Sequence, residues 1–327
     1  MPCVVFSASN EKSVPYSRNS PDYMNHGSAQ GISSFQDTLP ARDVERSEKT
    51  FDREKGEPTG KAEAPIGVFD SGAGGLTILS ALRRELPNEH YIYLGDTAHC
   101  PYGTRSDAEI TELSIHACYF LIEQGAKLIV VACNTASQAA LNTLRATFAV
   151  PFVGVVPAVK PAARATKRGR IGVAATNQAA KAIYLRQLID EFAEGIQVYA
   201  VGCPELVMLV ENGEFDGPEA EETVKHALQP LLSENVDVIV LGCTHFPALR
   251  SLIERITHNQ VQVIDSASAI ARRTHSVLDT DGMIHPSSPD HTSGGNLSVW
   301  CTGDPEAFSK VSSKLLGYPV VAHQITI

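Results

Sequence analysis

The sequence lacks several features that define whole classes of protein. No stretch approaches the roughly 18 consecutive apolar residues of a membrane-spanning helix, so we expect no membrane partner. There is no block of Lys or Arg, and the net charge is -10 at pH 7, which argues against nucleic acid as a partner. The seven cysteines include no Cys-x-x-Cys pair, and no secretory signal precedes them. A reducing, cytoplasmic location is therefore expected, in which a functional cysteine acts as a thiol or thiolate.

The N-terminal part differs from the rest of the 327 residues. Residues 1–64 hold eight Lys/Arg and ten Asp/Glu, and they show neither helical nor strand period. Segments of such low hydrophobicity cannot offset the entropy of ordering, so we predict a disordered extension. A dispensable extension, a start codon assigned too early and a regulatory arm all remain open for it.

From residue 65 onward, short apolar runs alternate with amphipathic segments. Strands are expected at nine places: 66–69, 91–94, 128–132, 152–156, 171–174, 198–201, 236–241, 261–264 and 297–300. Helical patterns cover 76–86, 107–124 and 219–232, among others. Continuous apolar strands that alternate with helices predict an α/β fold with parallel sheets covered on both faces.

The chain also resembles itself. Residues 127–135 (KLIVVACNT) are similar to residues 237–245 (DVIVLGCTH), an offset of 243 − 133 = 110. Residues 66–71 (IGVFDS) are similar to 171–176 (IGVAAT), an offset of 171 − 66 = 105. We therefore predict two similar α/β domains related by a pseudo-twofold axis, with a cleft between them. The first would cover 65–160, with a returning C-terminal segment near 266–327, and the second 161–265.

Two cysteines occupy equivalent places in this repeat. Cys133 and Cys243 each follow a buried strand and precede a helix. Ligands of parallel sheets bind beyond the carboxyl ends of the strands, so both thiols should face the cleft. A helix N-terminus also stabilises a thiolate.

Two thiols on opposite sides of a ligand suit the removal of a proton from one face of a carbon and delivery of a proton to the other. A Cys-His protease is one alternative, but it uses one cysteine nucleophile with one base, so the second cysteine would have no catalytic role. A zinc site made from Cys133, Cys243 and His245 is a further alternative, although no close ligand pair with the usual spacing is present.

Three loops add polar groups at strand ends. The Asp70–Gly75 loop (DSGAGG) is neither a dinucleotide fingerprint nor a P-loop, but its backbone N–H groups could hold a carboxylate at a helix N-terminus. The loop at 95–103 (GDTAHCPYG) places Tyr102 and Gly103 near the cleft. Glu205, in a Cys-Pro-Glu-Leu segment, and His245 are candidates for tuning one thiol, and Asp70 for tuning the other.

These motifs resemble the glutamate racemases of the aspartate/glutamate racemase superfamily. The matching stretches are residues 67–75 (GVFDSGAGG), 95–97 with 101–103, 132–136 (ACNTA), 154–158 (GVVPA), 202–206 (GCPEL) and 241–245 (LGCTH). The resemblance implies cofactor-independent interconversion of L- and D-glutamate, which supplies D-glutamate for bacterial peptidoglycan. It also implies a homodimer with its active site between two domains.

The resemblance assigns roles to residues of this chain. Cys133 and Cys243 look like the two proton donor/acceptors, with Cys133 acting on D-glutamate and Cys243 on L-glutamate. Asp70, Glu205 and His245 look like the groups that assist proton transfer. The residues that look like substrate contacts are Asp70, Ser71, Tyr102, Gly103, Asn134, Thr135, Thr244 and His245. No metal is implied, and no motif contains the lysine that a pyridoxal Schiff base requires.

Two other interpretations remain open from the sequence. One is a related racemase that acts on aspartate or another acidic amino acid. The other is a non-catalytic binding module that has kept the fold, against which the presence of both cysteines argues.

Overall fold

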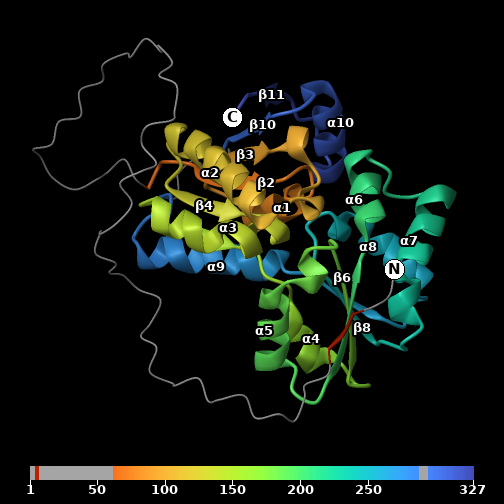
Figure 1. The fold of residues 1–327 in the computed structure, drawn as a ribbon. Coiled ribbons are helices and arrows are strands. Elements are labelled where there is room, and N and C mark those ends of the chain that lie inside the picture. The colour runs from red at the N-terminus through yellow and green to blue at the C-terminus, as the bar shows by residue number, and fades with distance from the viewer. Residues whose placement is uncertain (1–3, 7–61, 287–293) are drawn as a thin grey trace, which may run out of the picture. The chain divides into compact units, whose positions relative to one another are not determined.

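The computed structural model describes residues 4–6, 62–286 and 294–327, which form two sheets with helices on both faces (Figure 1). The first sheet has the strand order β11-β10-β3-β2-β4-β5, and the second has the order β1-β7-β6-β8-β9. The two-sheet α/β architecture predicted from the sequence is confirmed. No helix of the described residues is both long and apolar enough to cross a bilayer.

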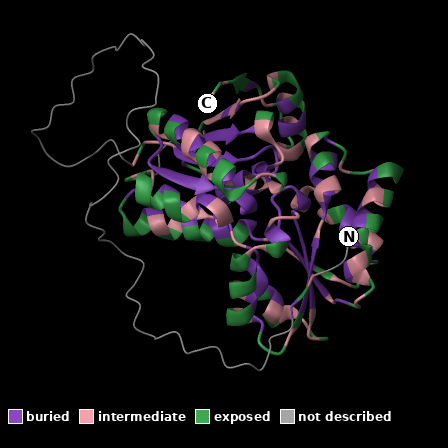
Figure 2. Cartoon of the chain, viewed as in Figure 1, coloured by how far each residue is buried: buried purple, intermediate pink, exposed green. Residues whose placement is uncertain are grey.

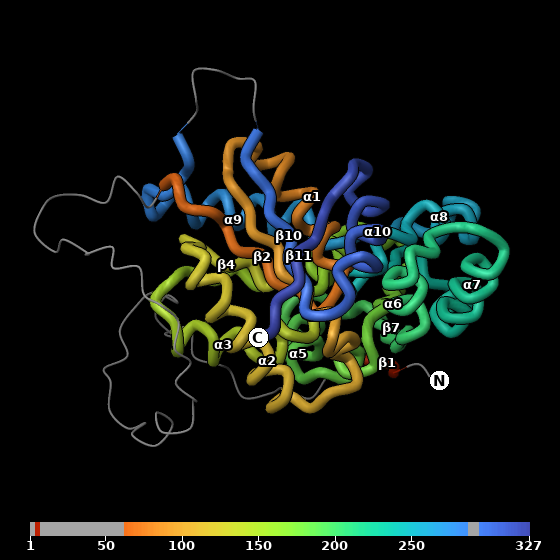
Figure 3. Tube along the Cα trace, turned by 90° about the horizontal axis from the view of Figure 1, so that it is seen from above, coloured from red at the N-terminus to blue at the C-terminus, as the bar shows by residue number. Residues whose placement is uncertain are grey.

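The strands of the first sheet are all parallel. They are β2 (Ile66–Asp70), β3 (Tyr91–Gly95), β4 (Leu128–Val131), β5 (Phe152–Gly154), β10 (Leu297–Cys301) and β11 (Ala322–Gln324). One face is covered by α1 (Leu76–Glu85), α9 (Ala267–Thr280) and α10 (Pro305–Leu316), and the other by α2 (Asp107–Glu123) and α3 (Asn134–Thr147). The last part of the chain thus joins the sheet that holds β2 and β3, and Figure 3 shows β10 among the strands of this sheet.

The second sheet is built mainly from the middle of the chain. Its parallel strands are β6 (Arg170–Ala175), β7 (Gln197–Gly202), β8 (Val238–Leu241) and β9 (Gln262–Ile264). Helices α6 (Pro204–Glu211), α7 (Pro218–Leu232) and α8 (Arg250–Ile256) cover one face, and α4 (Val159–Ala165) and α5 (Ile183–Phe192) cover the other. The strands are buried and the outer helix faces are exposed (Figure 2), as the continuous apolar strand patterns predict.

The internal similarity seen in the sequence corresponds to the same pairing in both sheets. The order β3-β2-β4-β5 of the first sheet matches β7-β6-β8-β9 of the second. Ile66 pairs with Leu128 in the first sheet, and Ile171 pairs with Val238 in the second. These pairs differ by the two sequence offsets, 171 − 66 = 105 and 238 − 128 = 110, so the same strand ends come together in each half.

The N-terminal extension departs from the prediction at one place. Val4–Phe6 form β1, which pairs antiparallel with β7 at the edge of the second sheet. The prediction of disorder is therefore wrong for these three residues. The reason is that the β-branched and aromatic side chains of this run complete an otherwise open sheet edge, and Phe6 is buried in the core below. The rest of the prediction, for residues 1–3 and 7–61, lies outside the described residues.

Candidate active site

The two predicted thiols lie at equivalent strand ends. Cys133 follows β4 and occupies the N-cap of α3, where the Ala136 N–H donates to its Sγ at 3.4 Å. Cys243 follows β8, the strand equivalent to β4. Both are free thiols with only 5% of their surface exposed, so each is held by the surrounding structure and not by a mobile loop.

A small cavity brings the two thiols together with most of the predicted substrate contacts. It measures ≈ 10 Å³, about the room that one water molecule needs. Its lining consists of Ser71, Pro101, Tyr102, Gly103, Cys133, Asn134, Thr135, Thr176, Val207, Cys243, Thr244 and His245. Residues from both sheets' loops thus surround one volume, with a thiol contributed by each half.

The environment of Cys133 favours its uncharged form. Its Sγ lies 3.5 Å from Ser71 Oγ. Burial, with a smaller contribution from the negative charge of Asp70, raises the pKa of Cys133 to about 12, although the Ala136 N–H and Ser71 act in the opposite direction. At neutral pH this group is therefore a thiol, and a nearby positive charge is needed to make it a base.

Cys243 has a different partner, a buried imidazole. Its Sγ lies 3.6 Å from His245 Nδ1, and His245 Nε2 lies 2.5 Å from Glu211 Oε1. Burial alone would lower the pKa of His245, but its hydrogen bonds with Cys100, Cys243 and Glu211 outweigh burial, so that this pKa stands well above its ordinary value. Conversely, His245 holds the pKa of Glu211 below its ordinary value in spite of burial. The pair is an imidazolium and a carboxylate, placed so that positive charge faces Cys243.

Asp70 ties the two halves together through Thr244, which lines the cavity. Its Oδ1 accepts the Gly72 N–H at 2.9 Å, and its Oδ2 accepts the Thr244 hydroxyl at 3.0 Å. Burial raises the pKa of Asp70, although His245 and the Gly72 N–H partly oppose this. In the lining of the cavity, Thr135 Oγ1 and Thr176 Oγ1 lie 3.1 Å apart and form a second link between the halves.

Glycines in two loops allow the halves to approach this closely. A Cβ on Gly72 would lie 2.0 Å from Glu211 Oε1, and one on Gly74 would lie 2.5 Å from His245 Nδ1. On the other side, a Cβ on Gly103 would lie 2.7 Å from the Cβ of Thr176. The glycine-rich sequence after β2 is thus required by contacts across the site, not only by the turn into α1.

One predicted residue is not where the sequence placed it. Glu205, in the first turn of α6, lines a separate pocket of ≈ 570 Å³ that also involves Glu222 and His226. The carboxylate that contacts His245 is Glu211, at the other end of the same helix. Six residues turn a helix by about 600°, so the two carboxylates point from different faces. A signal was available in the sequence, because Glu211 directly follows the apolar run Leu206–Val210 and a glutamate there is expected to be at least partly buried.

A second residue that the sequence reasoning missed is Asp96. It is fully buried, and its Oδ2 accepts the Tyr102 hydroxyl at 2.6 Å, while its Oδ1 accepts that of Thr302 at 2.7 Å. Burial and the charge of Asp96 raise the pKa of Tyr102, which therefore stays a neutral donor. Asp96 fixes the loop that carries Tyr102 and Gly103 against the cavity.

The zinc site considered from the sequence does not form. In the described part of the chain, the side chains close enough to share one metal ion are Cys100, Glu211 and His245, and neither Cys133 nor Cys243 belongs to this group.

Comparison with known proteins gives the family. A sequence profile of the Asp/Glu/hydantoin racemases matches residues 66–274. The chain belongs to the Asp/Glu/hydantoin racemase family. A glutamate racemase from Herpetosiphon aurantiacus is 44% identical over 249 residues, which are 76% of this chain and 96% of that relative.

Solved structures of the family have the same fold. The glutamate racemase isoform RacE1 from Bacillus anthracis is 34% identical, with a TM-score of 0.72 over 81% of this chain and 98% of its own. The Escherichia coli glutamate racemase, solved with L-glutamate and the activator UDP-MurNAc-Ala, is 36% identical, with a TM-score of 0.69 over 79% and 97% of the two chains. Membership of this racemase family rests on nearly the whole length of these relatives.

Proposed function

We propose that this chain interconverts L- and D-glutamate without a cofactor, by a two-base proton transfer at the α-carbon. The observation that carries the proposal is the pair of buried thiols, Cys133 and Cys243, at equivalent strand ends on one cavity. One thiolate removes the α-proton, and the other thiol delivers a proton to the opposite face. Glutamate is favoured over aspartate because the relatives that resemble the chain over most of its length are glutamate racemases.

The surroundings of the two thiols suit this division of work. The imidazolium of His245 beside Cys243 stabilises a thiolate there by charge. In the described part of the chain, the groups that shift the pKa of Cys133 most include no cation, so the substrate's own ammonium group is the source of positive charge that lowers this pKa from about 12. Cys133 thus becomes a base only when the substrate is bound, whereas the cation beside Cys243 belongs to the chain itself.

The carboxylates of the substrate have donors on both sides of the cavity. The hydroxyls of Ser71, Thr135 and Thr244 line it, with the amide of Asn134 beside them. Negative charge spreads from the α-carbon into the α-carboxylate when the proton leaves, and preorganised donors stabilise that charge most effectively inside a water-poor site. Asp70, His245 and Glu211 then act by positioning and charging the groups that touch the substrate.

The proposal extends to the context of the activity. We infer a homodimer in the bacterial cytoplasm that makes D-glutamate for peptidoglycan and does not bind nucleic acid, and we assign residues 65–160 with 266–327 and residues 161–265 as its two domains. Sedimentation of the purified chain tests the dimer.

The deciding experiment follows circular dichroism of L-glutamate, D-glutamate and L-aspartate with the purified chain. The circular dichroism signal of both glutamate enantiomers should decay to zero, whereas that of L-aspartate should not change. Decay of the signal from L-aspartate alone would contradict the substrate assignment. An unchanged signal with all three amino acids would favour the binding-module alternative.

The two thiols are tested separately. Cys133→Ser and Cys243→Ser should each abolish racemisation, because a hydroxyl is far less acidic than a thiol. Each variant should still eliminate the leaving group from a β-substituted glutamate analogue, since elimination needs one base only, and the two should prefer opposite enantiomers. The resemblance assigns D-glutamate to Cys133 and L-glutamate to Cys243. The same enantiomer preference in both variants would refute the two-face mechanism.

A further inference from the structure

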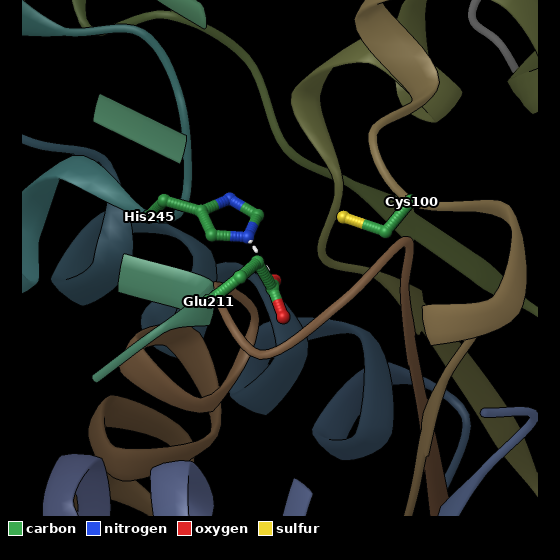
Figure 4. A group of neighbouring side chains, drawn as sticks. All are labelled: Cys100, Glu211 and His245. Atoms are coloured by element: carbon green, nitrogen blue, oxygen red, sulfur yellow. Dashed lines mark hydrogen bonds and ion pairs between the residues drawn. The ribbon is translucent and has the colours of Figure 1, made fainter. Parts of the chain in front are cut away.

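A third thiol lies next to the His245–Glu211 pair and takes no part in the proposed reaction. Cys100 stands in the loop before Tyr102 and is half-buried. Figure 4 shows its sulfur directed toward the imidazole of His245, with the Glu211 carboxylate below. One ligand atom from each of the three side chains lies within 4.8 Å of the other two.

We propose that Cys100, Glu211 and His245 form a binding site for a zinc-class divalent cation, and that the bound ion switches the enzyme off. A thiolate, an imidazole nitrogen and a carboxylate oxygen are the donors that Zn²⁺ takes in proteins, and three protein ligands leave a fourth position for water. The site differs from the set considered from the sequence, because it contains neither of the two proposed acid–base cysteines.

The spacing of the three ligand atoms is close to what a tetrahedral ion needs. Zn–N and Zn–O bonds of about 2.0–2.1 Å and a Zn–S bond of about 2.3 Å place the ligand atoms ~3.3–3.6 Å apart. The present separation of His245 Nε2 from Glu211 Oε1 is 2.5 Å, and no pair in the group exceeds 4.8 Å. Shifts of about 1 Å in side chains are therefore enough, with no movement of the sheets.

Groups around the site already hold two of the ligands in orientation. The Ala73 N–H donates to Glu211 Oε1 at 2.8 Å, and Cys243 contacts His245 Nδ1, the ring nitrogen that does not face the ion. Such partners fix ligand orientation in metal sites, and losing one costs ~10–100-fold in affinity. Gly72 adds room, because a Cβ there would meet Glu211 Oε1 at 2.0 Å and Cys100 Sγ at 3.1 Å.

Inhibition follows from shared residues, and this part of the proposal rests on the proposed function. On binding, Cys100 forms the S–metal bond and releases its thiol proton to solvent, and the ion displaces the proton on His245 Nε2, which also leaves to solvent. Glu211 then pairs with the ion instead of His245. The ion ties the loop of Cys100, Tyr102 and Gly103 to His245 and Glu211 of the other half and fixes the imidazole beside Cys243, so that proton transfer at Cys243 slows.

Metal binding is tested first, without reference to activity. The purified full chain, in a phosphine reductant, is titrated with Co²⁺ and followed by the thiolate-to-cobalt charge-transfer band, and with Zn²⁺ by calorimetry. One ion per chain is expected. Cys100→Ala should remove the band and weaken Zn²⁺ binding more than about 100-fold, since even a group that only orients a ligand is worth ~10–100-fold.

The matched control is Cys118→Ala, which removes a fully buried thiol in the core of the first sheet's helix layer. This variant should bind Co²⁺ and Zn²⁺ as the parent does. A band that persists in Cys100→Ala would overturn the proposal, because the ion would then sit on other thiols. Thermal unfolding of both variants shows that they are folded.

The second arm measures racemisation with added Zn²⁺. The parent and Cys118→Ala should lose activity as the ion binds and regain it with EDTA, while Cys100→Ala should need at least about 100-fold more Zn²⁺ for the same loss. Binding without inhibition would overturn the regulatory part. Absence of racemase activity before any metal is added would contradict the proposed function alone, and the Co²⁺ band would still report on the site.

Discussion

Replacing Glu211 by Gln gives the sharpest test of how the site is charged. The variant keeps an oxygen that can accept the Ala73 N–H, but it removes the negative charge 2.5 Å from His245 Nε2. The hydrogen bonds of His245, including that with Glu211, are what hold its pKa above its ordinary value against burial. Without the carboxylate, the imidazole is neutral over more of the pH range, and Cys243 loses its cationic neighbour.

The size of the effect can be worked from the separation of Cys243 and His245. Two unit charges 3.6 Å apart interact by about 4–5 kcal/mol at an effective dielectric constant near 20, which is an upper bound for the loss. Because a neutral imidazole still interacts with the thiolate, we expect about half of this, ~2–3 kcal/mol, which corresponds to a 30- to 150-fold fall in kcat. The KM should change little, since Glu211 does not line the cavity.

The control is Glu205→Gln, the same substitution at the other end of α6. Initial rates of racemisation are measured in both directions for the parent and the two variants, together with their thermal unfolding. Because the two products are mirror images of equal free energy, kcat/KM must fall equally in the two directions. An equal loss in Glu205→Gln, or no loss in Glu211→Gln, would refute the assignment of Glu211.

The same pair predicts a pH dependence of stability. The folded pKa of His245 is raised, so its contribution is complete below its ordinary value of 6.5 and is lost as the pH rises through the folded pKa. The folded pKa of Glu211 is lowered, so its contribution is complete above 4.5 and is lost as the pH falls through the folded pKa. The free energy of unfolding should therefore differ most between the parent and Glu211→Gln from pH 4.5 to 6.5. A difference that does not change with pH would contradict the ion pair.

Three further predictions concern the sheet edge, the glycine loop and cofactors. Phe6→Ala should lower the free energy of unfolding by about 1–3 kcal/mol in chemical denaturation, less than at a central core position because β1 is short and lies at a sheet edge. The Val5 side chain is 55% exposed on the other face, so Val5→Ala should change this free energy by less than ~0.5 kcal/mol. Equal effects of the two substitutions would show that β1 is not packed against the sheet. Gly72→Ala should displace Glu211 and lower kcat about as much as Glu211→Gln does. The control Gly294→Ala should be active, because its Cβ would lie at an ordinary contact distance of 3.4 Å from the carbonyl oxygen of Pro87. Full activity of Gly72→Ala would contradict the close approach of Gly72 to Glu211. Racemisation should survive EDTA, because every proposed acid–base group is a side chain, and a loss that zinc restores would point to a metal-dependent reaction.

Most of the fold followed from the sequence because buried parallel strands leave a strong signal. All nine expected strands from 66 to 300 are present, with ends that differ by one or two residues. The two strands that were missed have three residues each, β1 and β11, and both add to a sheet edge. Their formation depends on the open edge of a sheet that other segments build, which the local sequence pattern does not contain.

The residues of the site also fall into those that the sequence could predict and those that it could not. Cys133, Cys243 and Asp70 were predictable because they stand where buried strands end, and the ends of parallel strands meet at one edge. Glu211 is the last residue of a helix, so the rule that functional residues follow strand ends does not predict it. The motif that contains Glu205 pointed to the other end of the same helix. Asp96 stood inside a recognised motif, but its task depends on a hydrogen bond to Tyr102 that only the folded chain makes.

The ≈ 10 Å³ of the cavity has a consequence for every ligand that binds between the two thiols. Glutamate is many times larger than the one water that such a volume holds, so we expect a ligand to bind only the fraction of molecules in which the two halves have moved apart and links such as Asp70–Thr244 and Thr135–Thr176 have opened. The apparent dissociation constant is the intrinsic one divided by that fraction, and an open population of 1% therefore weakens binding about 100-fold. Substitutions that loosen either link, such as Thr176→Val, would tighten the binding of a competitive ligand without touching a single one of its contacts with the thiols.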